Sequence, residues 1–312
     1  MPPSHHQRSL DEQNAWALIS ALRARLRHGK PPLTNTGIRL GDNGDVLAVA
    51  PDDAWLLLTT EAERGWAWPA HGASCDAISV DPLTQLFDLY VPLCTGPNAP
   101  QLVVAHLAQS LDGRIATSNG ISQFISGPED LQHNHRMRAL FDAVMVGAST
   151  VEHDDPRLTT RLCPGEDPVR VVIDPQGRIG PEHRVVRDGP SRTVLLRREG
   201  YTSTALADHV EVIPVGSAHD QWLPISEILK TLRTRGLRRI FIEGGGITVS
   251  RFFEAGLLDR LQVSVSPIII GSGRPAFTLP EVLDLDGAKT FDARTFSMGR
   301  DVLFDCRLSN PA

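Results

Sequence analysis

The sequence predicts an α/β protein in which a mainly parallel central sheet carries helices on both faces. From residue 101 onward, short β-rich runs alternate with helical segments, an order typical of strand–helix–strand units. Two of the runs, VRVVID and RRIFIE, are nearly all apolar, as expected for central strands covered on both faces. A turn of three glycines follows the second run and leads into another helical segment. Ligands of such open sheets bind beside turns at the carboxyl ends of the strands.

The composition excludes several other classes of protein. The chain has 312 residues, of which 41% are hydrophobic and 22% charged, so one or two folded domains are expected rather than a disordered or fibrous chain. The formal net charge of −6 argues against a general nucleic-acid binder or a polybasic membrane-surface protein. No run approaches the roughly 20 apolar residues that span a bilayer, and the first residues lack the apolar core of a secretory signal. We therefore expect a cytoplasmic enzyme with neither nucleic acid nor a membrane as its partner.

The first third of the chain differs from the remainder. Four of the five tryptophans precede residue 97, and the segment CTGPNAP at residues 94–100 has the composition of a linker. Apolar residues on one helical face predict a helix over residues 10–28, and DNGD at residues 42–45 predicts a hairpin turn. This part contains no chemical motif. Residues 1–97 are therefore expected to form an amino-terminal extension of unknown role, and residues 98–312 the functional domain.

The elements of the second part can be placed one by one. The expected strands are Leu102–Leu107, Ala143–Val146, Val169–Asp174, Thr193–Leu196, Val210–Val215, Arg239–Glu243, Leu261–Ile270 and Val302–Cys306. A capping box, SGPE at residues 126–129, predicts a helix that runs to about Phe141. Helical spacing from Ile225 to Leu232 predicts a second helix, which Gly236 ends. A third helix follows the glycine turn.

The glycine turn, residues 244–246, is the most informative local motif. Free N–H groups at a helix start and close approach of the backbone make an anion-binding cradle that suits a nucleotide diphosphate. Three glycines are costly for a simple turn, because each loses extra backbone entropy on folding. A tight strand–helix connection without a ligand remains the alternative. Glu243, which precedes the turn, lies where open α/β sheets bind ligands.

Two further segments carry polar or glycine patterns. In residues 147–161, which follow an expected strand, Thr150 and Asp154 are candidates for ligand contacts, and Arg161 for a bidentate phosphate clamp. The alternative is an Asp-Asp-Pro turn with surface charges. Residues 271–276, GSGRPA, match GxGxxA, but Pro275 and the residues after it do not open a helix. We interpret this second match as accidental, because the dinucleotide-binding motif requires that helix.

Other chemistries lack their motifs. There is no GxxxxGK[ST] phosphate loop and no GxSxG nucleophile turn. HVE at residues 209–211 resembles half of a zinc-deaminase motif, but no PCxxC follows it. His133 and His135 are two residues apart on a helix, so they point to different faces and do not chelate together. The cysteines include no CxxC pair, so we expect no metal site.

Four stretches together resemble the reductase domain of riboflavin biosynthesis. They are HLAQSLDGRIAT, SQFISGPEDLQHNHRMRAL, DAVMVGASTVEHDDPRLTTR with VRVVIDPQGR, and IFIEGGGITVSRFFEAGLLDRLQVSVSPIIIGSG, in the order and spacing of that family over about residues 101–308. The resemblance implies a dihydrofolate-reductase-like fold, a homodimer, and NADPH-dependent reduction of the ribosyl group of 5-amino-6-(5-phosphoribosylamino)uracil to ribityl. Residues 1–97 lack the zinc deaminase domain of bifunctional members. Phe124 stands where some members have tryptophan.

The resemblance also implies roles for individual residues. Positions that match cofactor contacts are Ala108, Phe124, Thr150, Asp154, Gly245, Gly246, Ile247, Thr248, Val249, Ser250 and Arg251. Positions that match substrate contacts are Ser122, Arg138, Leu158, Arg161 and Glu243. Asp154 is the first candidate for proton transfer and Glu243 for orienting the substrate, while Arg178 is a candidate for the 2′-phosphate of NADPH. Alternatives are a reductase of the same fold for another pyrimidine or a pterin, and a non-catalytic nucleotide-binding protein.

Overall fold

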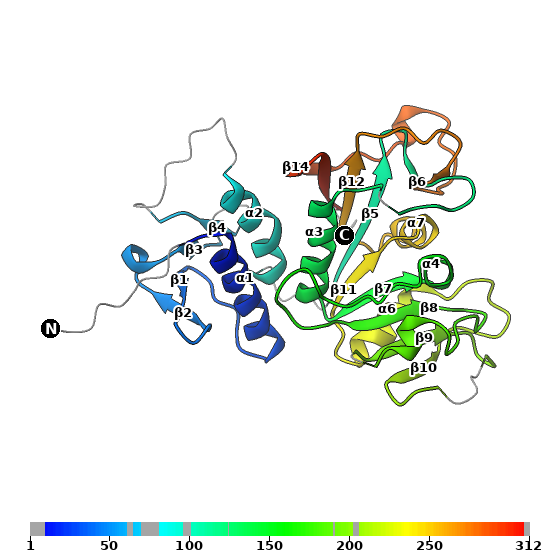
Figure 1. Cartoon of the computed structure of the whole chain (residues 1–312), viewed down its shortest axis with the longest axis horizontal. Coiled ribbons are helices and arrows are strands. Elements are labelled where there is room, and N and C mark those ends of the chain that lie inside the picture. The colour runs from blue at the N-terminus through cyan, green and yellow to red at the C-terminus, as the bar shows by residue number, and fades with distance from the viewer. Residues whose placement is uncertain are drawn as a thin grey trace. The chain divides into compact units, whose positions relative to one another are not determined.

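The computed structural model divides into two compact units, residues 1–99 and 100–312 (Figure 1). It describes residues 10–60, 65–69, 81–95, 101–123, 125–189, 191–201 and 206–308. No helix among these residues is both long and apolar enough to cross a membrane.

The first unit combines two helices with a small antiparallel sheet. Its elements are α1 (Glu12–Arg27), β1 (Thr36–Leu40), β2 (Val46–Val49), η1 (Pro51–Asp53), β3 (Leu56–Leu58), β4 (Trp66–Ala67) and α2 (Pro82–Thr95), with sheet order β2-β1-β3-β4. The predicted helix and the hairpin at residues 42–45 are both confirmed. Aromatic rings occupy its core. The rings of Trp16 and Tyr90 pack edge to face with their centroids 5.5 Å apart, and the indole N–H of the buried Trp66 donates a hydrogen bond to the Asp88 carboxylate. The tryptophans of this unit thus serve packing.

The second unit is built on one nine-stranded sheet, in the order β10-β9-β8-β7-β11-β5-β12-β15-β14. These strands are β5 (Leu102–Ser110), β7 (Ala143–Gly147), β8 (Val169–Ile173), β9 (Thr193–Arg197), β10 (Val210–Pro214), β11 (Arg239–Glu243), β12 (Arg260–Ser266), β14 (Asp292–Met298) and β15 (Asp301–Arg307). All neighbours from β10 to β12 run parallel, and β15 and β14 add an antiparallel edge. The predicted mainly parallel sheet is confirmed.

Helices cover both faces of this sheet. They are α3 (Pro128–Leu140), α4 (Ala148–Asp154), α5 (Arg184–Arg187), α6 (Ile225–Thr234) and α7 (Gly246–Glu254), with a 3-10 turn, η2 (Leu285–Gly287). On one face, side chains of β5 and β11 share a buried apolar cluster with α6 and α7. On the other face, His106 and Phe241 contact each other, and His106 also contacts His133 of α3. Alternate residues of each central strand therefore serve opposite layers.

The interface beneath α3 is unusually polar. His106 Nε2 lies 3.1 Å from Asp130 Oδ1, and His133 Nε2 lies 3.0 Å from Gln262 Oε1. Burial, together with the nearby His106, lowers the pKa of His133 to about 3, so this imidazole is neutral at ordinary pH. His135 instead accepts a hydrogen bond from the backbone N–H of Arg161, 2.8 Å away. The two histidines point to different surroundings, as their spacing predicts.

Several local predictions need correction. The N-cap of α3 is Gly127 and not Ser126, so the predicted capping box does not form. Ser126 instead hydrogen-bonds the side chain of Asp130. The strand expected to reach Ile270 ends at Ser266, because the chain turns away there to form the short ribbon of β6 (Arg114–Ala116) and β13 (Arg274–Pro275). Strand β14 was not predicted.

Candidate functional site

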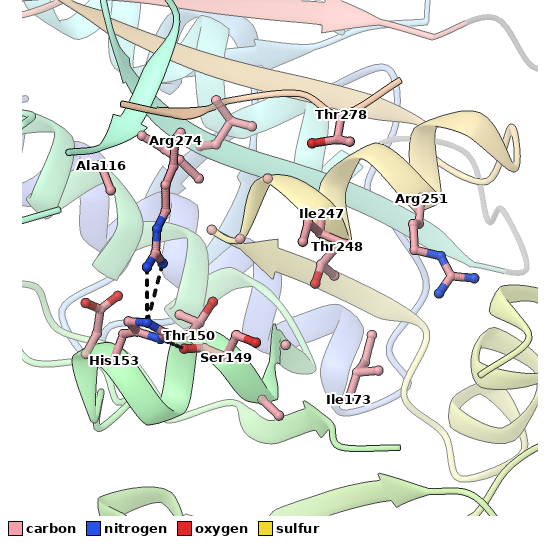
Figure 2. A pocket seen from close by; sticks show the side chains of 18 of the residues that line it. Ala116, Ser149, Thr150, His153, Ile173, Ile247, Thr248, Arg251, Arg274 and Thr278 are labelled. Carbon is pink, nitrogen blue, oxygen red and sulfur yellow. Dashed lines mark hydrogen bonds between the residues drawn. The ribbon is translucent and has the colours of Figure 1, made fainter. Parts of the chain in front are cut away.

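A cavity of about 660 Å³ lies at the carboxyl ends of β5, β7, β8 and β11 (Figure 2). This volume falls within the roughly 300–1,000 Å³ of small-molecule sites. Its walls come from the ends of these strands, the starts of α4 and α7, the β6–β13 ribbon and the loop before α6. The sheet thus opens where ligands of open α/β folds bind.

The glycine turn forms the middle of the cavity wall. Gly244 and Gly245 have φ angles of +67° and +74°, which L side chains rarely adopt, and α7 begins at Gly246 without a side-chain cap. A Cβ atom on Gly246 would lie 2.6 Å from the carbonyl oxygen of Ala276. The first turn of α7 therefore packs directly on a neighbouring backbone and keeps its unpaired N–H groups for an anion. The glycine turn and the helix after it, on which the predicted cradle depends, are confirmed.

The start of α4 meets the start of α7 beside this turn. A Cβ atom on Gly147, which ends β7, would lie 2.8 Å from Thr248 Oγ1. A Cβ atom on Gly245 would lie 3.1 Å from Thr150 Oγ1. The absence of side chains at both glycines brings the hydroxyls of Thr150 and Thr248 next to the cradle, where each can donate to an anionic ligand.

Most predicted cofactor positions line the cavity. Those that do so are Ala108, Thr150, Asp154, Gly245, Gly246, Ile247, Thr248 and Arg251. Val249 and Ser250 are buried behind the wall, and the Ser250 hydroxyl accepts from the N–H of Thr278 at 2.8 Å. Phe124 lies outside the described residues. Ser122, a predicted substrate position, also lines the cavity and donates to Asp154 Oδ1 over 3.1 Å.

The other four predicted substrate positions form a cluster next to the cavity. Arg138 Nε donates to Glu243 Oε2 over 2.8 Å, and Arg138 Nη2 binds the second oxygen, Oε1, of the same carboxylate. The Arg161 guanidinium donates to Thr159 Oγ1 over 2.6 Å. Leu158 is buried at a φ of +57°, an uncommon conformation for a branched residue. Glu243 precedes Gly244, which lines the cavity, and so joins this cluster to the cradle.

Within the described residues, one of the two arginines of the cluster, Arg161, forms no ion pair with a carboxylate. Burial lowers the pKa of His135 to about 4, and the charges of Arg138 and Arg161 act in the same direction, so His135 is neutral. Glu243 neutralises Arg138 through the bidentate pair. The charge of Arg161 remains, and burial followed by repulsion from Arg138 lowers its pKa. An incoming anion would relieve that repulsion.

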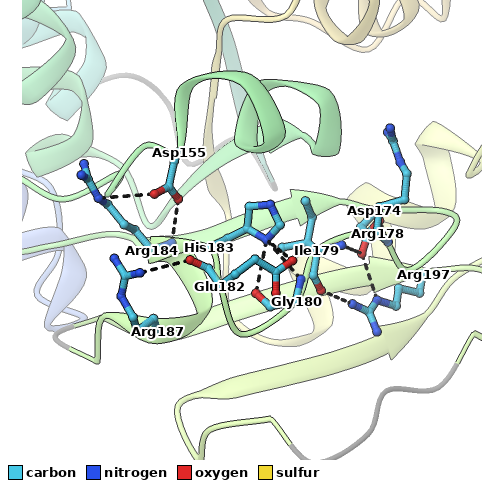
Figure 3. A network of polar contacts seen from close by, with 10 residues as sticks. All are labelled: Asp155, Asp174, Arg178, Ile179, Gly180, Glu182, His183, Arg184, Arg187 and Arg197. Atoms are coloured by element: carbon cyan, nitrogen blue, oxygen red, sulfur yellow. Dashed lines mark hydrogen bonds and ion pairs between the residues drawn. The ribbon is translucent and has the colours of Figure 1, made fainter.

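A buried network holds Arg178 in the cavity wall (Figure 3). The fully buried carboxylate of Asp174 accepts the backbone N–H groups of Arg178 and Ile179 and pairs with Arg197 Nε at 3.1 Å. The Arg178 guanidinium in turn donates to Glu152 Oε2 over 2.6 Å and to Ser149 Oγ over 3.3 Å. Asp174 thus fixes the turn that presents Arg178 to the cavity.

The cavity residues that were not predicted as site residues include His153, Trp222 and Arg274. Trp222 is 45% exposed, and the guanidinium carbon of Arg251 lies 4.4 Å from its ring centroid. Its one signal in the sequence is that it is the single tryptophan outside the first third of the chain. Among the described residues, no group of three or more His, Cys, Asp or Glu side chains is placed to hold a metal ion.

Fold and site together define an α/β protein with a glycine turn and a cavity at the carboxyl edge of its sheet. The profile of the RibD C-terminal domain family matches residues 101–304. The chain belongs to this family, which confirms the resemblance drawn from the four stretches. It is 35% identical over 215 residues to the 2,5-diamino-6-ribosylamino-4(3H)-pyrimidinone 5′-phosphate reductase of Methanothermobacter thermautotrophicus, spanning 65% of this chain and 96% of that relative.

Longer relatives match over part of their length. The riboflavin biosynthesis protein RibD of Escherichia coli is 32% identical over 200 residues, which is 59% of this chain and 53% of that protein. The solved deaminase/5-amino-6-(5-phosphoribosylamino)uracil reductase of Thermotoga maritima aligns with a TM-score of 0.58 at 27% identity, covering 72% of this chain and 61% of that one. RibD of Acinetobacter baumannii, with a TM-score of 0.61 at 24% identity, shares the fold. The chain thus spans about half to two thirds of the length of these longer proteins.

Proposed function

We propose that this protein is an oxidoreductase of riboflavin biosynthesis that uses NADPH to reduce the ribosyl group of 5-amino-6-(5-phosphoribosylamino)uracil to ribityl. The observation that supports the proposal is that two groups of residues suited to binding anions adjoin each other. The cradle at the start of α7 suits a dinucleotide diphosphate, and the adjoining cluster of Arg138, Arg161 and Glu243 suits a sugar phosphate. The names of the archaeal and bacterial relatives support the same reaction class.

The residues fit the cofactor and its chemistry. Gly245, Gly246 and Thr248 would hold the diphosphate of NADPH, which supplies a hydride when bound. The hydride acceptor is the sugar C1′, which becomes electrophilic when the ribosylamine opens to an imine, and a proton must reach the nitrogen. Asp154, held by Ser122, handles this proton, and Glu243, held by Arg138, orients the sugar. The protein's main task is to keep the two reacting carbons about 3–3.5 Å apart.

The direct test is turnover of the enzymatically prepared uracil substrate. NADPH oxidation is followed by absorbance, and mass spectrometry looks for a product heavier by two hydrogens. NADPH binding without turnover of this substrate would overturn the assignment. The 2,5-diamino pyrimidinone named for the archaeal relative is the second candidate, and the same assay compares the two substrates directly. Dihydrofolate tests the pterin alternative, and binding without any turnover indicates a non-catalytic nucleotide-binding protein.

The Arg138–Glu243 pair provides a first prediction for this function. Arg138→Lys is expected to lower kcat/KM about tenfold to a hundredfold. An ammonium group cannot bind both carboxylate oxygens at once as the planar guanidinium does, and a small displacement of Glu243 would take the substrate out of its reactive position. Steady-state kinetics with NADPH and the uracil substrate measure the effect. The control is Arg260→Lys, which alters the buried Arg260–Asp305 pair away from the cavity and should leave kcat/KM unchanged. Equal losses in both variants would contradict a role for the Arg138–Glu243 pair in the reaction.

Arg178 provides a second prediction, for the choice of NADPH over NADH. Its side chain is 40% exposed, and its guanidinium lies beside Ser149 in the cavity wall; we propose that this group contacts the 2′-phosphate. Arg178→Ala should reduce the ratio of kcat/KM for NADPH to that for NADH about tenfold to a hundredfold, because a charge-assisted contact is lost with NADPH only. Competing kinetics of the two cofactors measure the ratio. If the ratio is unchanged, Arg178 does not contact the 2′-phosphate, and another part of the protein does.

We further propose that the enzyme is a cytoplasmic homodimer and that residues 1–97 form an extension outside the catalytic machinery. An exposed apolar surface on the second unit supports the dimer. Val302 and Phe304 project from the same face of β15 and are 42% and 38% exposed. Leu283 and Leu285, which lie before β14, are 91% and 89% exposed. Exposed large apolar side chains of this kind favour association with another protein surface.

A further inference from the structure

The segment that carries Arg274 is fixed on both sides. The Asp112 carboxylate accepts the N–H groups of Ile270 and Gly271, at 3.1 and 2.7 Å, and these bonds with that from Ser110 lower the pKa of Asp112 to about 2. A Cβ atom on Gly273 would lie 2.2 Å from the Ala116 carbonyl oxygen. The next residues press against Gly246 of the cradle, as described above. The backbone at Arg274 therefore runs tightly between β6 and the start of α7.

The Arg274 side chain crosses from this segment to α4 (Figure 2). It passes Gly120, which has a φ of +90° and where a Cβ atom would lie 2.8 Å from Arg274 Nη2. Its Nη1 and Nη2 atoms both lie 3.4 Å from His153 Nε2. His153 Nδ1 lies 2.6 Å from the Ser149 carbonyl oxygen, which can only accept, so Nδ1 donates and Nε2 is left as the acceptor. A neutral imidazole thus holds the guanidinium in the cavity.

The Arg274 guanidinium forms no ion pair with a carboxylate within the described residues. Its side-chain interactions there are the two contacts with His153, whereas two other arginines of the site pair with carboxylates: Arg138 with Glu243 and Arg178 with Glu152. A guanidinium that contacts one imidazole nitrogen keeps most of its five N–H donors for a ligand. A cation fixed in a cavity without a carboxylate partner favours an anionic group.

We propose that Arg274 is a cofactor-binding residue that contacts the nicotinamide-side phosphate of the dinucleotide, and that His153 positions it. This inference rests on the proposed NADPH-dependent function. The cradle at α7 defines the place of the diphosphate, and Figure 2 places Arg274 and His153 at one end of the cavity and Arg251 at the other. Arg274 lies at the end that holds Ser122 and Asp154, where the proposed reaction takes place. The phosphate on its side is therefore the one nearer the nicotinamide.

The test compares two ligands that differ at this phosphate. NADPH contains both phosphates of the diphosphate, whereas adenosine 2′,5′-bisphosphate lacks the nicotinamide-side one. Arg274→Ala should weaken NADPH binding about tenfold to a hundredfold, mainly through faster dissociation in stopped-flow fluorescence, because a charge-assisted contact is lost. Binding of the bisphosphate, measured by calorimetry, should change less than twofold. Arg274→Lys should fall between Arg274→Ala and the unmodified protein, and His153→Ala should cost less than Arg274→Ala.

A control variant and the binding of NADPH by the unmodified protein separate the role of Arg274 from the proposed function. Arg235→Ala, at an exposed arginine that pairs with Glu211 outside the cavity, is the control and should bind both ligands normally. NADPH dissociation that is unchanged in Arg274→Ala, or equal weakening of both ligands, would overturn the contact with the nicotinamide-side phosphate. If the unmodified protein binds neither NADPH nor NADH, the proposed function itself fails, before any variant is compared.

Discussion

Asp154→Asn is expected to lower kcat about a hundredfold or more, the usual contribution of a positioned proton-transfer group. The carboxylate lines the cavity and is held by the Ser122 hydroxyl, with 3.1 Å between the two oxygens. An amide has nearly the same shape but cannot release or take up a proton, so binding should survive while the chemical step slows. Single-turnover oxidation of bound NADPH measures that step, and a separate titration measures NADPH affinity.

The neighbouring Asp155 offers a matched control for this prediction. Its carboxylate turns away from the cavity, accepts the N–H of Arg184 at 2.7 Å and pairs with the side chain of the same residue (Figure 3). Asp155→Asn makes the same chemical change one residue along the chain and should leave kcat near that of the unmodified protein. Full kcat/KM in Asp154→Asn would remove Asp154 from the path of the proton. Equal losses in both variants would point to a local disturbance of α4.

The central strands were predictable because strands that are buried on both faces have short, nearly all-apolar sequences. Val169–Ile173 and Arg239–Glu243 form β8 and β11 almost as expected. The edge of the sheet gives no such signal: β14, DARTFSM, is largely exposed and its residues alternate only weakly, so it escaped prediction. The capping box at Ser126 failed because Gly127 takes the cap position. Local sequence thus identifies the elements that the core determines and misses those that tertiary contacts determine.

The same distinction separates the parts of the site. The cradle is local, since three consecutive glycines and the helix after them make it, and it was predicted from residues alone. The Arg138–Glu243 pair joins residues 105 apart in the sequence, and Arg274 meets His153 across 121 residues. The family resemblance named both residues of the first pair as substrate positions without joining them, and no pattern in the sequence connects the second pair. GSGRPA, interpreted as an accidental motif, does not open a helix, and its arginine enters the cavity through a contact that only the fold creates.

Gly246→Ala is expected to weaken NADPH binding about a hundredfold or more, as expected for the loss of two or more charge-assisted hydrogen bonds. The added Cβ would lie 2.6 Å from the Ala276 carbonyl oxygen and 3.0 Å from that of Pro275, and both neighbours are backbone atoms that cannot rotate away. The start of α7 must therefore move off the segment that carries Arg274, which displaces the N–H groups of the cradle. The same strain should lower the free energy of unfolding by about 1–3 kcal/mol, as overpacking commonly does.

A second glycine of α7 separates these two effects. Gly256, just beyond the carboxyl end of the helix, has a φ of +66° and open space where a Cβ would stand. Gly256→Ala should cost about 1 kcal/mol of stability through backbone strain, yet it leaves the cradle in place and should bind NADPH normally. Calorimetric titration with thermal unfolding of both variants distinguishes binding from stability. If the two variants lose stability equally and both still bind NADPH, then NADPH binding does not require the close backbone contact at Gly246. If only Gly246→Ala loses the cofactor, the glycine serves the ligand rather than the turn, because the variant with a comparable effect on the helix keeps its binding.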